Sequence, residues 1–222
     1  MSNTKSKNQQ ITTIIWDWNG TLINDTSICI EAMNQLLVIR NMQLLNKDIY
    51  QEKFTFPVKD YYENIGFDFK KEPFEKPALE FIDNYHALLP NAKLFNEVNT
   101  VLAGLKHAGY KMIILSAMEE ESLKKSVNEL GIGKYFDAIV GINNHFAKSK
   151  IERGKFIIKQ MDIELSSTIL IGDTLHDKEV ADEIGCNCIL VANGHQSHSR
   201  LSINGNVVSH SLSEVSQLIA KM

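Results

Sequence analysis

The sequence predicts an α/β protein, in which a parallel β-sheet with helices on both faces carries an inserted, all-helical segment. Short runs that are apolar along almost their whole length are typical of strands covered on both faces. Such runs lie at residues 14–16, 111–115, 138–140, 168–171 and 188–191. From residue 96 onward, helical periodicity fills the intervals between them, and strands that alternate with helices favour a parallel sheet.

The segment after the first strand has a different character. Apolar residues at helical spacing predict three helices in it, over residues 28–39, 58–66 and 78–89. Asp25 and Thr26 are candidate caps of the first helix, and Pro90 ends the third. The polar N-terminus predicts a frayed tail. The expected organisation is a tail at 1–10, a core formed by 11–22 and 91–222, and a helical cap at 23–90.

Composition excludes several classes of function. The formal net charge is −4, with 44% hydrophobic residues, so no electrostatic argument favours nucleic acid or an anionic membrane as a partner. No apolar run approaches the ~20 residues that cross a bilayer, and the polar N-terminus does not resemble a secretory signal. Three cysteines are too few for a disulfide framework and favour a reducing compartment. We therefore expect a cytoplasmic protein, for which the sequence indicates no particular oligomeric state.

Polar side chains follow the predicted strands where each strand ends. Asp17 follows the first strand, Ser116 the second, and Asp173 a later one, with Asp177 in the next helix. In open α/β sheets, ligands bind at the carboxyl ends of the strands. A lysine begins the predicted helix that precedes the Asp173 strand. Lys150 fits the start of this helix better than Lys148 does. Carboxylates, a hydroxyl and an amine at one sheet edge predict a site for an anion and a hard cation.

Each of these residues also has a purely structural interpretation. Ser116 could cap a helix, Asn19-Gly20 could form a turn, and a lysine at a helix start is usually solvated. His195, in the loop after the last strand, could reach the rim of the site, but a loop histidine is more often exposed, and exposure is the expectation here. The aromatic residues of the insert are expected to form its own core, with one or two available to select substrate: Phe54, Phe56, Tyr61 and Tyr62.

Taken in order, these motifs resemble those of the haloacid dehalogenase superfamily. The resemblance rests on Asp17-Trp18-Asn19-Gly20-Thr21, on Ser116 after an apolar strand, on the lysine, and on Gly172-Asp173-Thr174-Leu175-His176-Asp177. It covers residues 13 to about 221. It implies a Rossmann-like core, and the helical insert after the first motif is similar to the cap of the phosphoglycolate-phosphatase-like branch.

The resemblance also implies roles for the site residues. Asp17 would attack phosphorus and form an aspartyl-phosphate. Mg²⁺ would be held by Asp17, the backbone carbonyl of Asn19, Asp173 and Asp177. Lys150 would offset the clustered negative charge. Phosphate would be bound by Ser116, the N–H of Ala117, Gly20 and Thr21.

One position departs from the family pattern. Phosphatases of this family usually carry a second aspartate two residues after the nucleophile, where this chain has Asn19. An amide cannot exchange a proton near neutral pH, and general acid–base catalysis contributes about 10²–10⁴-fold. The leading hypothesis is a Mg²⁺-dependent phosphatase that acts on a small phosphorylated metabolite. The alternatives are a weakly active or inactive protein that binds a phosphorylated ligand, and an enzyme of the same family with a different reaction.

Overall fold

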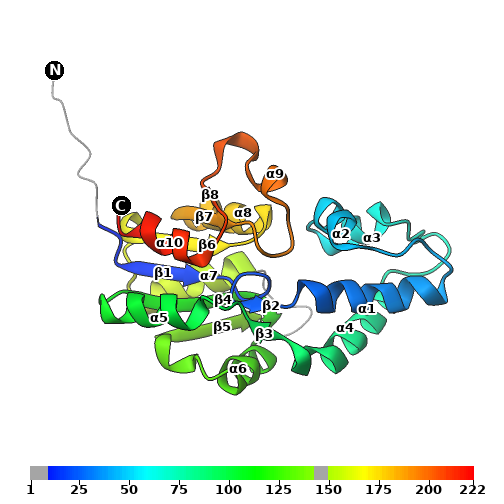
Figure 1. Ribbon diagram of the computed structural model, residues 1–222, viewed down its shortest axis with the longest axis horizontal. Coiled ribbons are helices and arrows are strands. Elements are labelled where there is room, and N and C mark those ends of the chain that lie inside the picture. Colours follow the sequence, from blue (N-terminus) through cyan, green and yellow to red (C-terminus); the bar gives the residue numbers. More distant parts are fainter. Residues whose placement is uncertain (1–9, 143–149) are drawn as a thin grey trace.

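A parallel β-sheet forms the centre of the molecule (Figure 1). The computed structural model describes residues 10–142 and 150–222, so most of the predicted tail and Lys148 lie outside the described residues. In strand order β5-β4-β1-β6-β7-β8, every neighbouring pair is parallel. The strands are β1 (Thr13–Trp16), β4 (Lys111–Glu119), β5 (Ala138–Ile142), β6 (Thr168–Gly172), β7 (Asn187–Val191) and β8 (Val208–Ser209). The predicted α/β class is confirmed, while the two-residue β8 is too short to have given a sequence pattern.

Helices cover both faces of this sheet. They are α5 (Val98–His107), α6 (Glu120–Glu129), α7 (Lys150–Gln160), α8 (Leu175–Ile184), α9 (His198–Leu201) and α10 (Leu212–Ile219). Alternate side chains of β1 enter different cores, because successive residues of a strand point to opposite faces. Ile14 packs in one core with residues of α5 and α10, and Ile15 packs in the other with residues of α8.

The insert between β1 and the rest of the sheet is helical, as predicted. In Figure 1 its helices lie together beside the carboxyl end of β1. They are α1 (Thr26–Ile39), α2 (Lys47–Lys53), α3 (Val58–Asn64) and α4 (Glu75–Leu88). We refer to these four helices and their connections as the insert. Helix α2 was not predicted, because aromatic and charged residues obscure its periodicity.

A short antiparallel pair joins the insert to the core. Strands β2 (Ile23–Asn24) and β3 (Lys93–Leu94) pair with each other. The sequence predicted an all-helical cap over residues 23–90, and this expectation was wrong at β2. Two residues are too few to show an alternating pattern. The predicted boundaries of the insert lie close to this pair.

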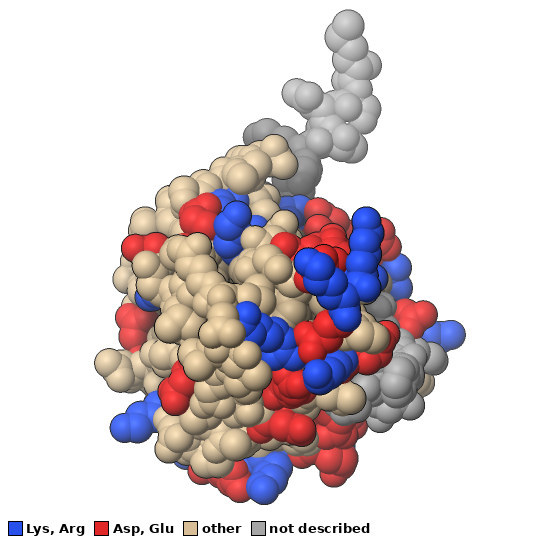
Figure 2. Space-filling model, turned by 90° about the vertical axis from the view of Figure 1, so that its right-hand side faces the viewer, with Lys and Arg blue, Asp and Glu red and all other residues tan. Residues whose placement is uncertain are grey.

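Surface charge is mixed on the face that the insert presents. Figure 2 shows lysine and arginine side chains interspersed with aspartate and glutamate there, so neither sign covers this face. Among the described residues, no helix is long and apolar enough to cross a membrane.

Candidate active site

The backbone of Asp17 continues the β1 ladder toward β6. Its N–H donates to the carbonyl of Ile171 across 2.8 Å. The parallel register sets Trp16 beside Ile114 of β4 and Ile171 of β6. Because these strands run in the same direction, the residues that follow them meet at one edge of the sheet. Asp17, Ser116 and Asp173 are brought together there, and all three are buried.

Lys150, the first residue of α7, bridges two of the carboxylates. Its Nζ lies 2.5 Å from Oδ1 of Asp17 and 2.6 Å from Oδ1 of Asp177. Burial would lower the pKa of Lys150, but the carboxylates of Asp17 and Asp177 raise it above its ordinary value. The amine is therefore a buried ammonium ion. It stands where the sequence favoured a site lysine.

Three carboxylates crowd around this ammonium. Asp17, Asp173 and Asp177 each offer an oxygen, and these oxygens lie within 4.8 Å of one another. Burial raises the pKa of Asp17 to about 6 and that of Asp173 to about 7, and for each of them the charge of Asp177 adds to the effect. Burial would also raise the pKa of Asp177, but Lys150 holds it below its usual range. Three acids against one ammonium leave an excess of negative charge, so this oxygen donor set fits a hard divalent cation.

Gly20 and Thr21 support the loop that follows Asp17. The Thr21 hydroxyl donates to Asp173 Oδ1 across 3.0 Å and lies 3.3 Å from Asp17 Oδ2. The Gly20 N–H donates to Asp25 Oδ1 across 2.9 Å. Gly20 has a φ of +70°, and a Cβ there would overlap the side chains of Asp173 and His195. The Gly20 N–H and the Thr21 hydroxyl, two of the groups assigned to phosphate from the sequence, therefore already donate to carboxylates. Neither residue lines the cavity described below.

Ser116 and Ala117 do line that cavity, together with Asp17 and Lys150. The hydroxyl oxygen of Ser116 accepts a hydrogen bond from the N–H of Met118 across 3.0 Å. Its own hydrogen remains able to donate to a ligand. Ser116 does not cap a helix, which was its alternative interpretation, because Glu119 is the N-cap of α6. Strand β4 itself runs to Glu119, beyond its predicted end.

Asp25 is a site residue that the sequence analysis treated only as a helix cap. It stands at the N-cap position of α1, but its side chain makes no capping hydrogen bond. Instead its buried carboxylate accepts from Asn19 Nδ2 at 2.7 Å and from the Tyr85 hydroxyl at 2.8 Å. Asn19 Nδ2 also lies 2.8 Å from the Tyr85 oxygen. Nothing in the spacing of Asp25 distinguishes it from an ordinary cap, so no sequence signal could have found this role.

His195 was expected to be exposed, and this expectation was wrong, since the residue is only 5% exposed. Its Nε2 lies 3.4 Å from Asp25 Oδ1, and its Nδ1 lies 2.9 Å from the Tyr50 hydroxyl. Its backbone N–H donates to Asp173 Oδ2 across 2.5 Å. Burial would lower the pKa of His195, but Asp25 and Asp173 raise it to about 9. The loop after β7 therefore folds inward. The protonated ring of His195 links this loop of the core to the insert.

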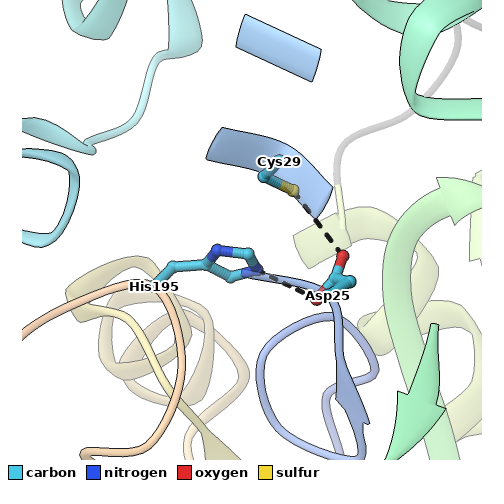
Figure 3. A group of neighbouring side chains, drawn as sticks. All are labelled: Asp25, Cys29 and His195. Carbon is cyan, nitrogen blue, oxygen red and sulfur yellow. Dashed lines mark hydrogen bonds and ion pairs between the residues drawn. The ribbon is translucent and has the colours of Figure 1, made fainter. Parts of the chain in front are cut away.

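Figure 3 shows Asp25 between this histidine and Cys29, whose Sγ lies 3.7 Å from Asp25 Oδ2. The three side chains could offer metal ligands within 4.8 Å of one another. However, the Asp25 oxygens already accept from Asn19, Gly20 and Tyr85. We therefore interpret this group as a hydrogen-bonded cluster rather than a metal site.

A cavity of about 330 Å³ lies over the carboxylates. Its core side is polar and includes Asp17, Asn19, Ser116, Lys150 and Asp173. Its insert side is mainly aromatic and aliphatic, with side chains from all four helices and their connections. Phe54, Phe56, Tyr61 and Tyr62 all line the cavity, and Tyr61 and Tyr62 are also buried in the hydrophobic core, as expected for the aromatic residues of the insert. The arrangement can hold an anion and a cation on one side and an apolar group on the other.

Comparisons with known proteins agree with this geometry. A family model described as haloacid dehalogenase-like hydrolase matches residues 14–191. A phosphoglycolate phosphatase of Aquifex aeolicus is 25% identical over 214 residues, which cover 94% of this chain and 95% of that protein. Another, from Caulobacter vibrioides, is 24% identical and covers 91% of this chain and 88% of its own length. A solved haloacid dehalogenase-like hydrolase from Streptococcus pneumoniae has the same fold, with a TM-score of 0.79 at 22% identity over 94% of this chain and 98% of that one.

Proposed function

Because the chain belongs to the haloacid dehalogenase-like hydrolases, we propose that it is a Mg²⁺-dependent phosphatase that uses Asp17 as its nucleophile. The observation that carries this proposal is the position of Lys150. Its ammonium lies 2.5 Å from Asp17 in a buried cluster of three carboxylates, at the floor of a cavity large enough for a small metabolite.

The chemistry would proceed in two displacements at phosphorus. First, a carboxylate oxygen of Asp17 forms a bond to phosphorus, and the ester P–O bond breaks with its electron pair passing to the leaving oxygen. Water then attacks phosphorus and gives one proton to solvent, and the bond between phosphorus and the Asp17 oxygen breaks with its electron pair passing to the carboxylate. Inorganic phosphate leaves and the Asp17 carboxylate is restored.

The chain's own donors would bind the phosphoryl group. These donors would be the Ser116 hydroxyl, the Ala117 N–H and the Lys150 ammonium, and the fact that all three residues line the cavity supports this role. Gly20 and Thr21 would hold the Asp17 loop rather than bind phosphate directly. Asp177 accepts from Lys150 and would fix the direction of that ammonium.

Mg²⁺ would be held by Asp17, the backbone carbonyl of Asn19 and Asp173, with Asp177 beside them. When bound, the ion supplies positive charge that offsets the repulsion between the nucleophile and the phosphoryl oxygens. Burial raises the pKa values of Asp17 and Asp173 even with Lys150 nearby, and this uncompensated negative charge supports the assignment.

The insert would act as a cap that selects a small phosphorylated substrate in the cytoplasm. Two relatives are phosphoglycolate phosphatases, which makes 2-phosphoglycolate the first compound to test. The second candidate function is binding of a phosphorylated ligand with little turnover, and Asn19 is the observation that favours it. A different reaction at Asp17 is the third.

Phosphate release from a panel of phosphorylated compounds tests the proposal. Wild-type protein with Mg²⁺ should release phosphate, EDTA should abolish release, and Asp17→Asn should reduce it by at least 10³-fold. An acid-labile phosphate trapped on Asp17 would support the covalent step. Release that is equal in Asp17→Asn and the wild type would refute it, and tight binding without release would favour the second candidate.

A further inference from the structure

We propose that the substrate of this site is the phosphate ester of an uncharged, aromatic alcohol. This inference rests on the proposed function and names its substrate class. It is carried by the aromatic cavity wall opposite Asp17 together with the amide at Asn19.

The insert side of the cavity suits an apolar group. Phe54, Phe81 and Tyr62 line it from different parts of the insert, along with Met33 and Ile82. Aromatic side chains there meet edge to face or stacked, as Phe54 does with Tyr61 at a centroid distance of 5.2 Å. A planar ring that binds against this wall would remove a large apolar surface from contact with water.

The same wall offers little to a second negative charge. Among the described residues, Lys150 is the only lysine on the cavity and no arginine lies there. Lys150 is already paired with Asp17 and Asp177. Three histidines line the cavity. His176 of α8 pairs with Glu179 and stacks on Phe56. The ring nitrogens of His195 face Asp25 and Tyr50, which leaves His86 of the insert. A substrate carboxylate or second phosphate would therefore be buried without a strong cationic partner, which is costly.

Tyr61 provides a polar contact in this otherwise apolar wall. Its side chain is 3% exposed, and its hydroxyl has no hydrogen-bond partner among the described residues. Its ring packs between those of Tyr50, Phe54 and Tyr62. A buried hydroxyl without a partner is unfavourable, so a ligand acceptor that reaches it would be bound selectively.

Asn19 leads independently to the same class. Without a carboxylic acid at this position, the leaving oxygen departs unprotonated or takes its proton from solvent. A phenol has a pKa of about 10, so a phenolate leaves far more readily than an alkoxide. Among phosphate esters of hydroxyl compounds, aryl esters are thus the ones on which the missing acid costs least.

Four esters, assayed with the whole chain and Mg²⁺, test separately the apolar cavity, the leaving group and the tolerance for substrate charge. Benzyl phosphate and glycerol 1-phosphate both have alkoxide leaving groups, so their comparison tests the cavity. Phenyl phosphate against benzyl phosphate tests the leaving group, and 2-phosphoglycolate tests the tolerance for charge. We expect kcat/KM to fall from phenyl to benzyl phosphate, and benzyl phosphate to exceed both glycerol 1-phosphate and 2-phosphoglycolate by at least tenfold.

A charge placed on the cavity wall provides the matched test. Ile82 of α4 lines the cavity, whereas Leu79 on the same helix does not line it and is 61% exposed. Ile82→Lys should lower kcat/KM for benzyl phosphate at least tenfold and raise it for 2-phosphoglycolate, while Leu79→Lys changes neither by more than twofold. Some aromatic esters that carry a hydrogen-bond acceptor on the ring should be better substrates of the wild type than benzyl phosphate is. For these esters Tyr61→Phe, which conserves the ring, should lower kcat/KM about tenfold.

The outcomes distinguish the substrate class from the proposed function. Hydrolysis of 2-phosphoglycolate or glycerol 1-phosphate at a kcat/KM equal to or above that of benzyl phosphate would overturn the aromatic class and leave the phosphatase intact. Absence of Mg²⁺-dependent release from all four esters, with no phosphate trapped on Asp17, would overturn the phosphatase itself.

Discussion

The side-chain amide of Asn19 donates to the carboxylate of Asp25 across 2.7 Å. Asp25 is fully buried and also accepts from Gly20 and Tyr85. The position that usually holds an acid in this family is thus occupied here by a donor that satisfies a different acid. A carboxylate introduced at position 19 would face Asp25 at hydrogen-bond distance, and two carboxylates this close share a proton.

Asn19→Asp should therefore restore an acid with a raised pKa. On benzyl phosphate, whose leaving group is an alkoxide, we expect kcat to rise about 10- to 100-fold. On 4-nitrophenyl phosphate, which needs no acid, the change should stay within about threefold. The double variant Asn19→Asp with Asp25→Asn keeps the number of charges constant and serves as the control for repulsion. Equal changes on both esters would contradict the role assigned to position 19.

Lys150→Met should impair both stability and activity. It leaves Asp17 and Asp177 buried without their cation, and breaking a buried pair costs about 3–5 kcal/mol. The loss of the ammonium should also lower kcat about 10²-fold or more. Chemical denaturation and phosphate release, each with saturating Mg²⁺, measure the two effects.

Lys155→Met is the matched control on the same helix. Its side chain is half exposed and pairs with Glu183 at the surface. Exposed pairs contribute little, so the free energy of unfolding should change by less than about 1 kcal/mol and kcat should be unchanged. Comparable losses in the two variants would show that α7 as a whole, and not the ammonium of Lys150, is responsible.

Mg²⁺ binding should strengthen between pH 5 and pH 8. The pKa values of Asp17 and Asp173 without a cation are about 6 and about 7, so both carboxyls hold protons at pH 5 and have largely lost them by pH 8. At pH 5 the ion must displace these protons, which weakens its binding. The rise in Tm on adding Mg²⁺ should be small at pH 5 and large at pH 8. Asp173→Asn should suppress the rise at both pH values.

His195→Asn should destabilise the protein in a pH-dependent manner. The folded-state pKa of about 9 lies above the ordinary 6.5 of histidine, so the stabilisation is fully present below pH 6.5 and is lost as the pH rises through 9. The free energy of unfolding of wild type should exceed that of the variant by about 3 kcal/mol at pH 6, and by much less at pH 10. His107→Gln, at an exposed position of α5, is the control and should change the free energy of unfolding at pH 6 by less than about 0.5 kcal/mol.

The apolar pattern of the sequence was enough to predict the architecture, and the residues at the predicted strand ends gave the acids proposed for the site. Runs of apolar residues and helical periodicity are local properties, and they indicated the strands of the parallel sheet except β8. Parallel strands end at a common edge, so polar residues near the carboxyl ends of β1, β4 and β6 could be predicted to lie together. The position of Lys150 followed from the helix start that its neighbours predict.

Only the tertiary structure decided how Asn19, Asp25 and His195 are used. Asp25 and His195 are 170 positions apart, and their contact depends on how the loop after β7 folds against the insert. The carboxylates of Asp25 and Asp173, which raise the pKa of His195, and the unpartnered hydroxyl of Tyr61 depend equally on packing between distant segments. Periodicity reports which face of an element is apolar, but it carries no information about which distant side chains meet there.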